Sequence, residues 1–235
     1  TAGVILRALV NLEAEGGDTF FGEPELEPAD LLRVSDQGTG VITLFEVGEQ
    51  AARPVMFSTF LMWVLANLFN DLPEVGDVDK PKLVFFFDEA HLLFKDASKA
   101  FLAQVEQTVK LIRSKGVGVF FCTQLPTDVP NAVLSQLGAR IQHALRAFTP
   151  DDQQALAKTV RTYPRTEFYD LASDLTSLGI GEAIVTVLSE RGAPTPVAWT
   201  RLRSPRSLMD TIGPDYIKAA AKSSPLFLKD GPTVD

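Results

Sequence analysis

The chain has 235 residues, of which 46% are hydrophobic and 22% are charged. This composition is typical of a globular protein with a sizeable core, and it excludes a disordered chain or a fibre. Acidic residues outnumber basic ones by 30 to 22, and residues 1–80 alone hold 14 acids and 4 bases. A protein that coats nucleic acid is therefore disfavoured, although a local contact through a few Lys or Arg side chains stays open.

Compartment and membrane contact follow from three further features. The single cysteine, Cys122, cannot form an intramolecular disulfide, and its position in an apolar run predicts a core residue. The first residues lack the basic and apolar segments of a signal peptide. The longest apolar run, Val55 to Phe69, is shorter than the roughly 20 residues that span a bilayer. We expect a cytoplasmic protein without membrane contact.

The first part of the chain mixes apolar and acidic segments. Val4 to Val10 is apolar enough for a helix or a strand, and Glu13 to Asp36 is typical of an exposed connector. Gly40 to Glu46 is β-branched and aromatic, which predicts a short strand. Pro54 to Leu72 predicts a helix covered on most sides, with Pro73 just beyond its end.

The middle of the chain alternates between strands and helices. Lys82 to Phe87 and Val117 to Thr123 are continuous apolar runs, which predict strands buried on both faces of a parallel sheet. Asp96 to Lys115 has apolar residues at helical spacing, and Gly116 follows as a stop signal. Ala139 to Phe148 predicts a third strand.

The last part predicts a helix and a hairpin. Thr149 followed by Pro150 and two acids is a strong helix start. Residues 182–188 and 196–202 flank a turn and predict a hairpin, and the chain beyond Pro205 predicts a peripheral helix and tail. The whole pattern indicates an α/β fold whose ligands bind beyond the carboxyl ends of parallel strands.

Two adjacent carboxylates follow the first of these apolar strands. Asp88 and Glu89 after Phe87 have the pattern of a Walker B motif. In that motif the first acid holds Mg²⁺ through water, and the second orients and deprotonates the attacking water. The alternative is that Asp88 caps the next helix and Glu89 lies in its first turn.

Polar residues also follow the second apolar strand. Thr123 and Gln124 would lie beside Asp88 and Glu89 if the two strands are parallel neighbours. There they are candidates for nucleotide binding, and Gln124 could sense the γ-phosphate or hold the attacking water. Alternatively, they only begin a turn.

Two arginines lie in or beside the third predicted strand. Arg140 and Arg146 are six positions apart, so they share a face if the strand is unbroken. An arginine placed against a transferring phosphoryl group raises its rate of transfer, in cis or from a neighbouring subunit. Surface salt bridges are the alternative role. His91 and His143 lack a second ligand at metal spacing, which disfavours a zinc site.

The phosphate-binding loop that these residues would serve is not in this sequence. No G-x-x-x-x-G-K-[ST] motif occurs. Either the chain does not act on nucleotides, or that half of the site lies upstream of Thr1, and the abrupt start favours the second interpretation.

With these residues in place, the chain resembles the HerA/FtsK superfamily of P-loop ATPases, and most closely the bacterial HerA-like proteins of uncharacterised function. The stretches that carry the resemblance are residues 73–94, 112–156 and 178–196. A DEAH sequence also occurs in two-domain helicases, but their later Gln-Arg-x-Gly-Arg type motif is not found here.

This resemblance implies a RecA-like core with a mainly parallel sheet flanked by helices, ATP with Mg²⁺, and a hexameric ring through which DNA could thread. It implies that Asp88 is the metal residue, Glu89 the catalytic base, Gln124 the sensor, and Arg140 or Arg146 the arginine that contacts phosphate.

On this interpretation, residues 1–203 are the carboxyl-terminal part of an ATPase domain, and residues 204–235 are a peripheral helix and tail. The full-length protein would be a motor ATPase acting on DNA, and this chain alone would be inactive. The alternative is a nucleotide-binding ring or scaffold that does not move DNA. Neither the cargo nor a nuclease or regulator partner can be identified from the residues.

Overall fold

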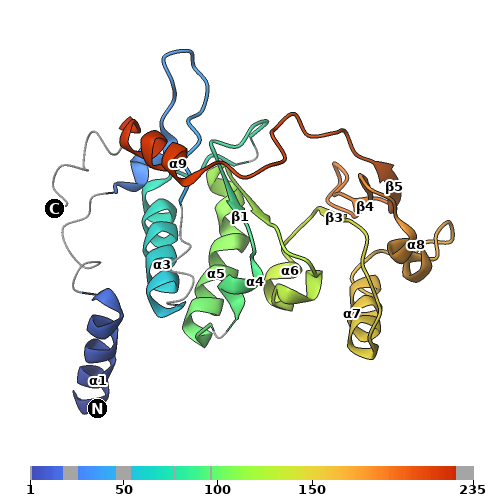
Figure 1. Ribbon diagram of the computed structural model, residues 1–235, viewed down its shortest axis with the longest axis horizontal. Helices are drawn as coiled ribbons and strands as arrows, with labels where there is room; N and C mark the ends of the chain where they lie inside the picture. The colour runs from blue at the N-terminus through green and yellow to red at the C-terminus, as the bar shows by residue number, and fades with distance from the viewer. Residues whose placement is uncertain (1, 18–25, 46–53, 77, 96, 226–235) are drawn as a thin grey trace. The chain divides into compact units, whose positions relative to one another are not determined.

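The computed structural model describes residues 2–17, 26–45, 54–76, 78–95 and 97–225 (Figure 1). The chain divides into two compact units. One comprises Thr1–Gly22 and Leu26–Leu202, and the other comprises Glu23–Glu25 and Arg203–Asp235. The described part of the second unit contains helix α9 (Pro214–Lys222). The candidate site lies in the first unit.

A pair of parallel strands lies in the first unit. β1 (Leu83–Phe87) and β2 (Val117–Phe121) are parallel and in register from their first residues to their last. Between them the chain forms α4 (His91–Phe94), α5 (Lys99–Leu111) and the 3₁₀ turn η4 (Ile112–Lys115). Both predicted strands and their parallel pairing are confirmed.

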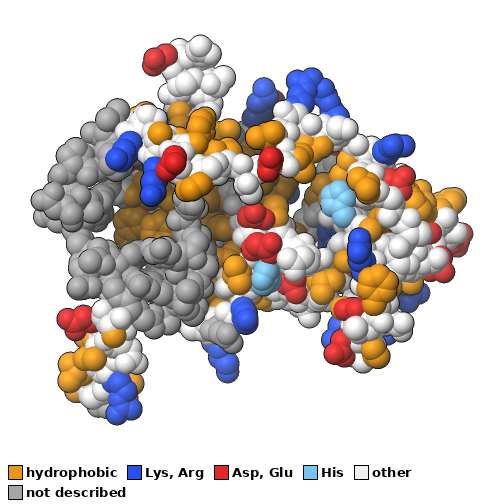
Figure 2. Space-filling model, in the orientation of Figure 1, with side chains coloured by type: hydrophobic (Ala, Val, Ile, Leu, Met, Phe, Trp, Pro, Cys, Tyr) orange, Lys and Arg blue, Asp and Glu red, His pale blue; other side chains and the backbone are white. Residues whose placement is uncertain are grey.

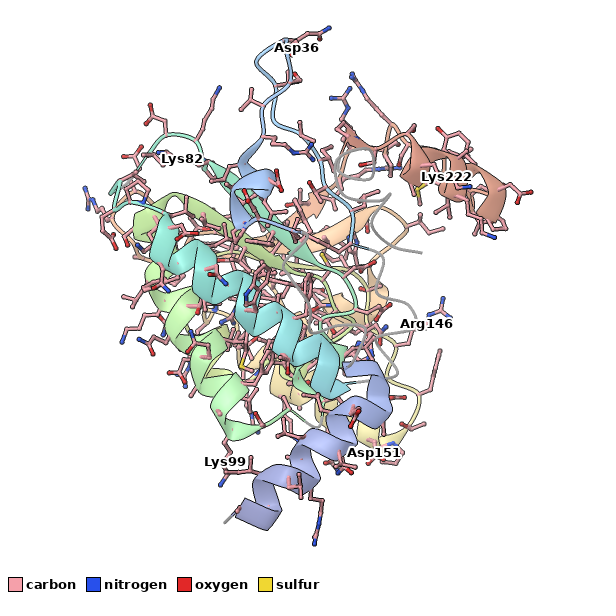
Figure 3. The ribbon with its side chains drawn as sticks, turned by 90° about the vertical axis from the view of Figure 1, so that its left-hand side faces the viewer. Asp36, Lys82, Lys99, Arg146, Asp151 and Lys222 are labelled. Carbon is pink, nitrogen blue, oxygen red and sulfur yellow. The ribbon has the colours of Figure 1, made fainter. Side chains whose placement is uncertain are left out.

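Helices α3 (Pro54–Asp71) and α5 cover one face of this sheet (Figures 1 and 3). Alternate strand residues such as Phe85, Phe87 and Phe121 pack against the cluster that these helices form. Buried residues of the cluster include Leu61, Leu65, Phe101, Val105 and Val133. A second set of buried residues joins α3 to η4 and β2, and it comprises Leu31, Val64, Leu68, Leu72, Ile112 and Val117.

The opposite face of the two strands is open. Phe86 is 68% exposed and Phe120 is 50% exposed, and their rings stack with centroids 4.7 Å apart. The prediction that both strands are buried on both faces is therefore wrong for the described structure, because α3 and α5 pack on the same side. Apolar side chains among charged ones are visible on the surface in Figure 2.

The third predicted strand is shorter and pairs differently. β3 (Arg140–Gln142) is antiparallel to β4 (Glu182–Thr186), which is antiparallel to β5 (Ala198–Arg201). The prediction of a strand over residues 139–148 is wrong beyond Gln142. There the Leu145 N–H donates to the carbonyl of Leu175, and the buried Leu145 side chain joins a cluster that includes Leu171, Leu175 and Ile184.

The predicted hairpin and helix start are confirmed beside this sheet. β4 and β5 form the hairpin, and α7 (Pro150–Val160) begins at Thr149, whose side chain accepts a hydrogen bond from the N–H of Asp152. Helix α8 (Leu171–Ser177) follows. Their shared core consists of Leu145, Tyr163, Leu171, Leu175, Leu178, Ile184 and Val197.

The amino-terminal segment is helical where it is described. α1 (Ala2–Leu12) is followed by η1 (Glu13–Gly17) and, later, by the 3₁₀ turn η2 (Pro28–Leu32). The strand predicted over 40–46 is not formed by residues 41–45, and residue 46 lies outside the described residues. No helix in the described residues is long and apolar enough to cross a membrane.

Candidate functional site

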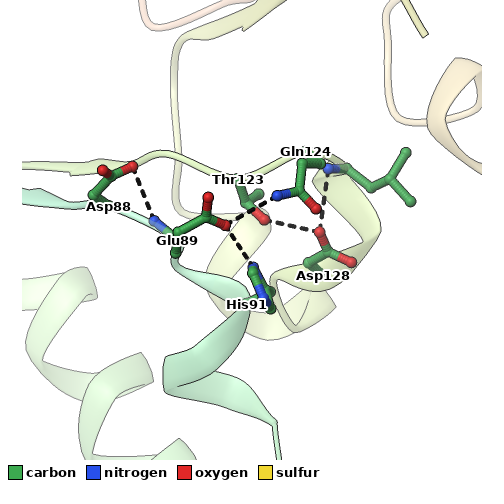
Figure 4. Close-up of polar contacts among 7 residues, drawn as sticks. Asp88, Glu89, His91, Thr123, Gln124 and Asp128 are labelled. Carbon is green, nitrogen blue, oxygen red and sulfur yellow. Dashed lines mark hydrogen bonds and ion pairs between the residues drawn. The ribbon is translucent and has the colours of Figure 1, made fainter. Parts of the chain in front are cut away.

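The candidate site begins where β1 and β2 end at the same edge. Phe87 lies opposite Phe121, and the pairing continues past both strands. The Cys122 N–H donates to the carbonyl of Phe87 over 2.8 Å, and the Ala90 N–H donates to the carbonyl of Cys122 over 2.9 Å. These two bonds place the residues after β1 beside those after β2 (Figure 4).

The chain turns sharply at Glu89. Its φ angle is +47°, which is the left-handed region that a residue with a Cβ adopts at a cost of roughly 1–2 kcal/mol. The Oδ1 atom of Asp88 accepts a hydrogen bond from the Glu89 N–H over 3.0 Å. Helix α4 has Ala90 at its N-cap without a side-chain bond, so the alternative role of Asp88 as a helix cap is not what the structure shows.

Two side chains converge on the carboxylate of Glu89. The Nε2 atom of Gln124 donates to Glu89 Oε2 over 3.0 Å, and the Nδ1 atom of His91 lies 3.1 Å from the same oxygen (Figure 4). The His91 contact is an ion pair when the imidazole is protonated. Asp88, Glu89, Thr123 and Gln124 thus come together as the sequence predicted, and His91 joins them.

A short 3₁₀ turn that follows Gln124 bonds to the residues on both sides of it. In η5 (Pro126–Asp128), Asp128 Oδ2 accepts from the Thr123 hydroxyl over 2.8 Å and from the Leu125 N–H over 3.1 Å. Sequence reasoning missed Asp128. The signal was present, because Pro126 and Asp128 stand after Leu125 in the spacing that Pro150 and Asp152 have after Thr149.

Cys122 lies at this edge but is not a core residue. The prediction of a buried cysteine is wrong, since β2 ends at Phe121 and Cys122 is exposed. Desolvation and then the negative charge of Asp88 raise the pKa of the Cys122 thiol. A raised pKa disfavours the thiolate, so Cys122 is a poor nucleophile.

The two candidate arginines have different surroundings. Arg140 is half-buried on β3, where its guanidinium donates to the carbonyl of Thr162 and lies 5.9 Å from the ring centroid of Tyr163. Desolvation lowers the pKa of Arg140 and raises the pKa of Tyr163 to about 12. Arg146 is exposed in the loop between β3 and α7, and its side chain points away from the ribbon in Figure 3. They do not share a strand face, because β3 ends at Gln142.

The donor set at the edge suits a hydrated magnesium ion. Mg²⁺ prefers oxygen ligands and keeps several of its waters, so one exposed carboxylate is a suitable protein contribution. Asp88 is exposed and stands at the end of a parallel strand. No group of three or more His, Cys, Asp or Glu side chains that could hold a metal ion occurs within the described ranges.

Comparison with solved structures defines the class of fold. The bacterial conjugative coupling protein TrwB in its unbound form matches with a TM-score of 0.52 at 15% sequence identity, over 77% of this chain and 44% of that chain. TrwB in complex with ADP and Mg²⁺ matches equally well, over 76% of this chain and 43% of that chain. The fold is that of the RecA-like P-loop NTPases.

Sequence comparison defines the family. The model of the helicase HerA-like C-terminal family matches residues 1–235, and the chain belongs to this family. A curated relative, the probable helicase MJECL08 of Methanocaldococcus jannaschii, is 28% identical over 167 residues. That match covers 68% of this chain and 30% of the relative, so the chain spans less than a third of its length.

Proposed function

We propose that this chain supplies the hydrolytic half of an ATP-driven motor of the HerA type, which translocates along DNA as a ring of identical subunits. The observation that carries the proposal is the contact between Gln124 and Glu89, which joins the ends of two neighbouring parallel strands. Family membership supports an ATPase in general. ATP would supply the electrophilic phosphoryl group, and Mg²⁺ held through Asp88 would activate it.

Each residue has a distinct task in this proposal. Asp88 holds the water shell of the metal, and Glu89 takes the proton from the attacking water. Gln124 would hold that water or contact the γ-phosphate, and its hydrogen bond to Glu89 supports this role. Because both flanking strands are fixed in register, these side chains need little reorganisation.

We assign the arginine contact to Arg146 rather than to Arg140. The guanidinium of Arg140 is engaged by Thr162 and Tyr163 within its own chain. Arg146 is exposed on a loop, and an exposed arginine can reach the nucleotide of a neighbouring subunit in a ring. Arg140 then orders the β3 region rather than contacting phosphate.

The test is ATP turnover by the full-length protein with and without double-stranded DNA. Glu89→Gln should lower kcat by roughly 10²–10⁴-fold, the range for loss of a general base. Glu190→Gln, the same change in the exposed hairpin turn, is the matched control and should leave kcat unchanged. Equal turnover by the wild type and Glu89→Gln would refute the role of Glu89.

The DNA arm separates the motor from the second candidate function. A nucleotide-binding ring or scaffold that does not move DNA is favoured by the acidity of residues 1–80, since a DNA channel attracts DNA through basic side chains. DNA-stimulated turnover at low salt supports the motor. Turnover that ignores DNA leaves an ATPase with another cargo, and binding of ATP without turnover favours the scaffold.

A further inference from the structure

We propose that Asp128 is the positioning residue that holds Gln124 against Glu89, and that it acts on the reaction only through Gln124. The inference deepens the proposed function and rests on it, because it concerns the geometry of the same hydrolytic site. Asp128 does not contact Glu89 in the structure; its partners are the residues on either side of Gln124.

A single oxygen atom makes both contacts. Asp128 Oδ2 accepts from the hydroxyl of Thr123, which precedes Gln124, and from the N–H of Leu125, which follows it (Figure 4). Bonds on both sides of one residue restrict its backbone more than a bond at one side would. The Gln124 side chain, itself exposed, therefore leaves the loop from a fixed point and reaches Glu89 Oε2 over 3.0 Å.

Residues on both sides of the Asp128 turn pack into two separate hydrophobic clusters. The Val129 side chain is buried in the cluster formed by α3 and α5, whereas Leu125 packs against the cluster around α7 and α8. The Asp128 N–H also donates to the carbonyl of Leu125 over 3.1 Å, which closes the turn. Asp128 thus fixes the exposed Gln124 side chain relative to the two hydrophobic clusters.

The charge of Asp128 is not required for this role. One acceptor oxygen makes both bonds, and the amide oxygen of asparagine offers the same acceptor. Asp128→Asn should therefore keep the loop in place, whereas Asp128→Ala removes both bonds. Thr123→Val removes one of the two bonds, and Thr123→Ser retains it.

The experiment measures kcat, nucleotide affinity and their dependence on Gln124 in the full-length protein. Asp128→Ala should lower kcat by roughly 10–100-fold, as expected when a reacting group is misplaced by about 1 Å. The dissociation constant of a fluorescent ATP analogue should change by less than about twofold, because Asp128 itself does not contact the nucleotide in this proposal. Asp128→Asn should restore kcat to within about threefold of the wild type.

The decisive arm is a double-mutant cycle. If Asp128 acts through Gln124, Asp128→Ala should cause no further loss of kcat in a protein that already carries Gln124→Ala. A multiplicative loss in the double variant would show that Asp128 affects turnover by another route and would overturn the proposal. So would an equal loss of kcat in Asp128→Ala and Asp128→Asn.

A readout without turnover separates this inference from the proposed function. Hydrogen exchange of the Leu125 amide should be about tenfold faster in Asp128→Ala than in the wild type, and close to the wild type in Asp128→Asn. If Glu89→Gln does not affect turnover, the proposed function fails while the exchange result still decides whether Asp128 holds the loop. Unchanged exchange in Asp128→Ala would refute the positioning role outright.

Discussion

Replacement of the buried lysine Lys115 by methionine should destabilise the chain by about 2 kcal/mol. The side chain of Lys115 is only 9% exposed, and its ammonium donates to the carbonyl of Leu72 over 2.7 Å. The same ammonium lies 4.7 Å from the ring centroid of Phe69. Lys115→Met keeps the apolar stem of the side chain and removes these polar contacts.

The magnitude follows from the two contacts that disappear. A hydrogen bond from a charged donor contributes about 1.5–3 kcal/mol, and a cation–π contact contributes about 0.5–2 kcal/mol. The positive charge also compensates the carboxyl-terminal end of the α3 dipole, just before Leu72. Methionine carries no ammonium that must be desolvated on folding, and this difference offsets part of the lost stability.

Urea unfolding followed by circular dichroism measures the effect, with an unchanged m-value as the sign that only stability has changed. Glu74→Gln is the control. The Glu74 side chain is 65% exposed and its Oε1 atom lies 3.5 Å from the ammonium of Lys115, so its removal should cause no measurable shift. A Lys115→Met protein as stable as the wild type, or a larger loss in Glu74→Gln, would refute the reasoning.

Three other predictions concern the core, a turn and a helix cap. Phe101→Ala should cost about 3–5 kcal/mol, because Phe101 is fully buried, whereas Phe148→Ala at an exposed position should cost little; similar urea midpoints for the two would contradict this. Gly116→Ala should cost about 1–2 kcal/mol, since Gly116 has φ +74° and an added Cβ would lie 3.1 Å from Val75; unchanged thermal unfolding would refute it. Hydrogen bonds from Thr149 lower the pKa of Asp152, so its stabilising contribution is present above the ordinary value of 3.8 and is lost as the pH falls through the lower folded-state pKa. The stability difference between the wild type and Asp152→Asn should therefore shrink in acid titrations monitored by fluorescence, and a difference that grows at low pH would count against this reasoning.

The parallel strands and the convergence of residues at their ends were predictable from the sequence. Continuous apolar runs at 83–87 and 117–121 favour strands, and a crossover between them favours parallel pairing. Once the strands are parallel neighbours, Glu89 and Gln124 must follow them at the same edge. The Thr149 cap was equally predictable, because capping depends on residues within one turn.

Long-range pairing was not predictable in the same way. The run at 139–148 is apolar enough to extend as a strand, but β3 ends at Gln142 and Leu145 packs in the cluster with Leu171, Leu175 and Ile184. Which face of β1 is covered likewise depends on where α3 and α5 pack, and Phe86 lies on the open side.

The sequence by itself therefore determined the elements whose signals are local: the apolar strands, the capped helices and the carboxylate pair at a strand end. Only the tertiary structure decided which side chains meet, because contacts between residues far apart in the chain depend on the packing of every element between them. The hydrogen bond from Gln124 to Glu89 and the engagement of Arg140 by Thr162 are contacts of this kind. Asp128 combines both kinds of contact. Its hydrogen bond to Leu125 is local and follows from sequence spacing, whereas its proposed role depends on the contact of Gln124 with the distant Glu89.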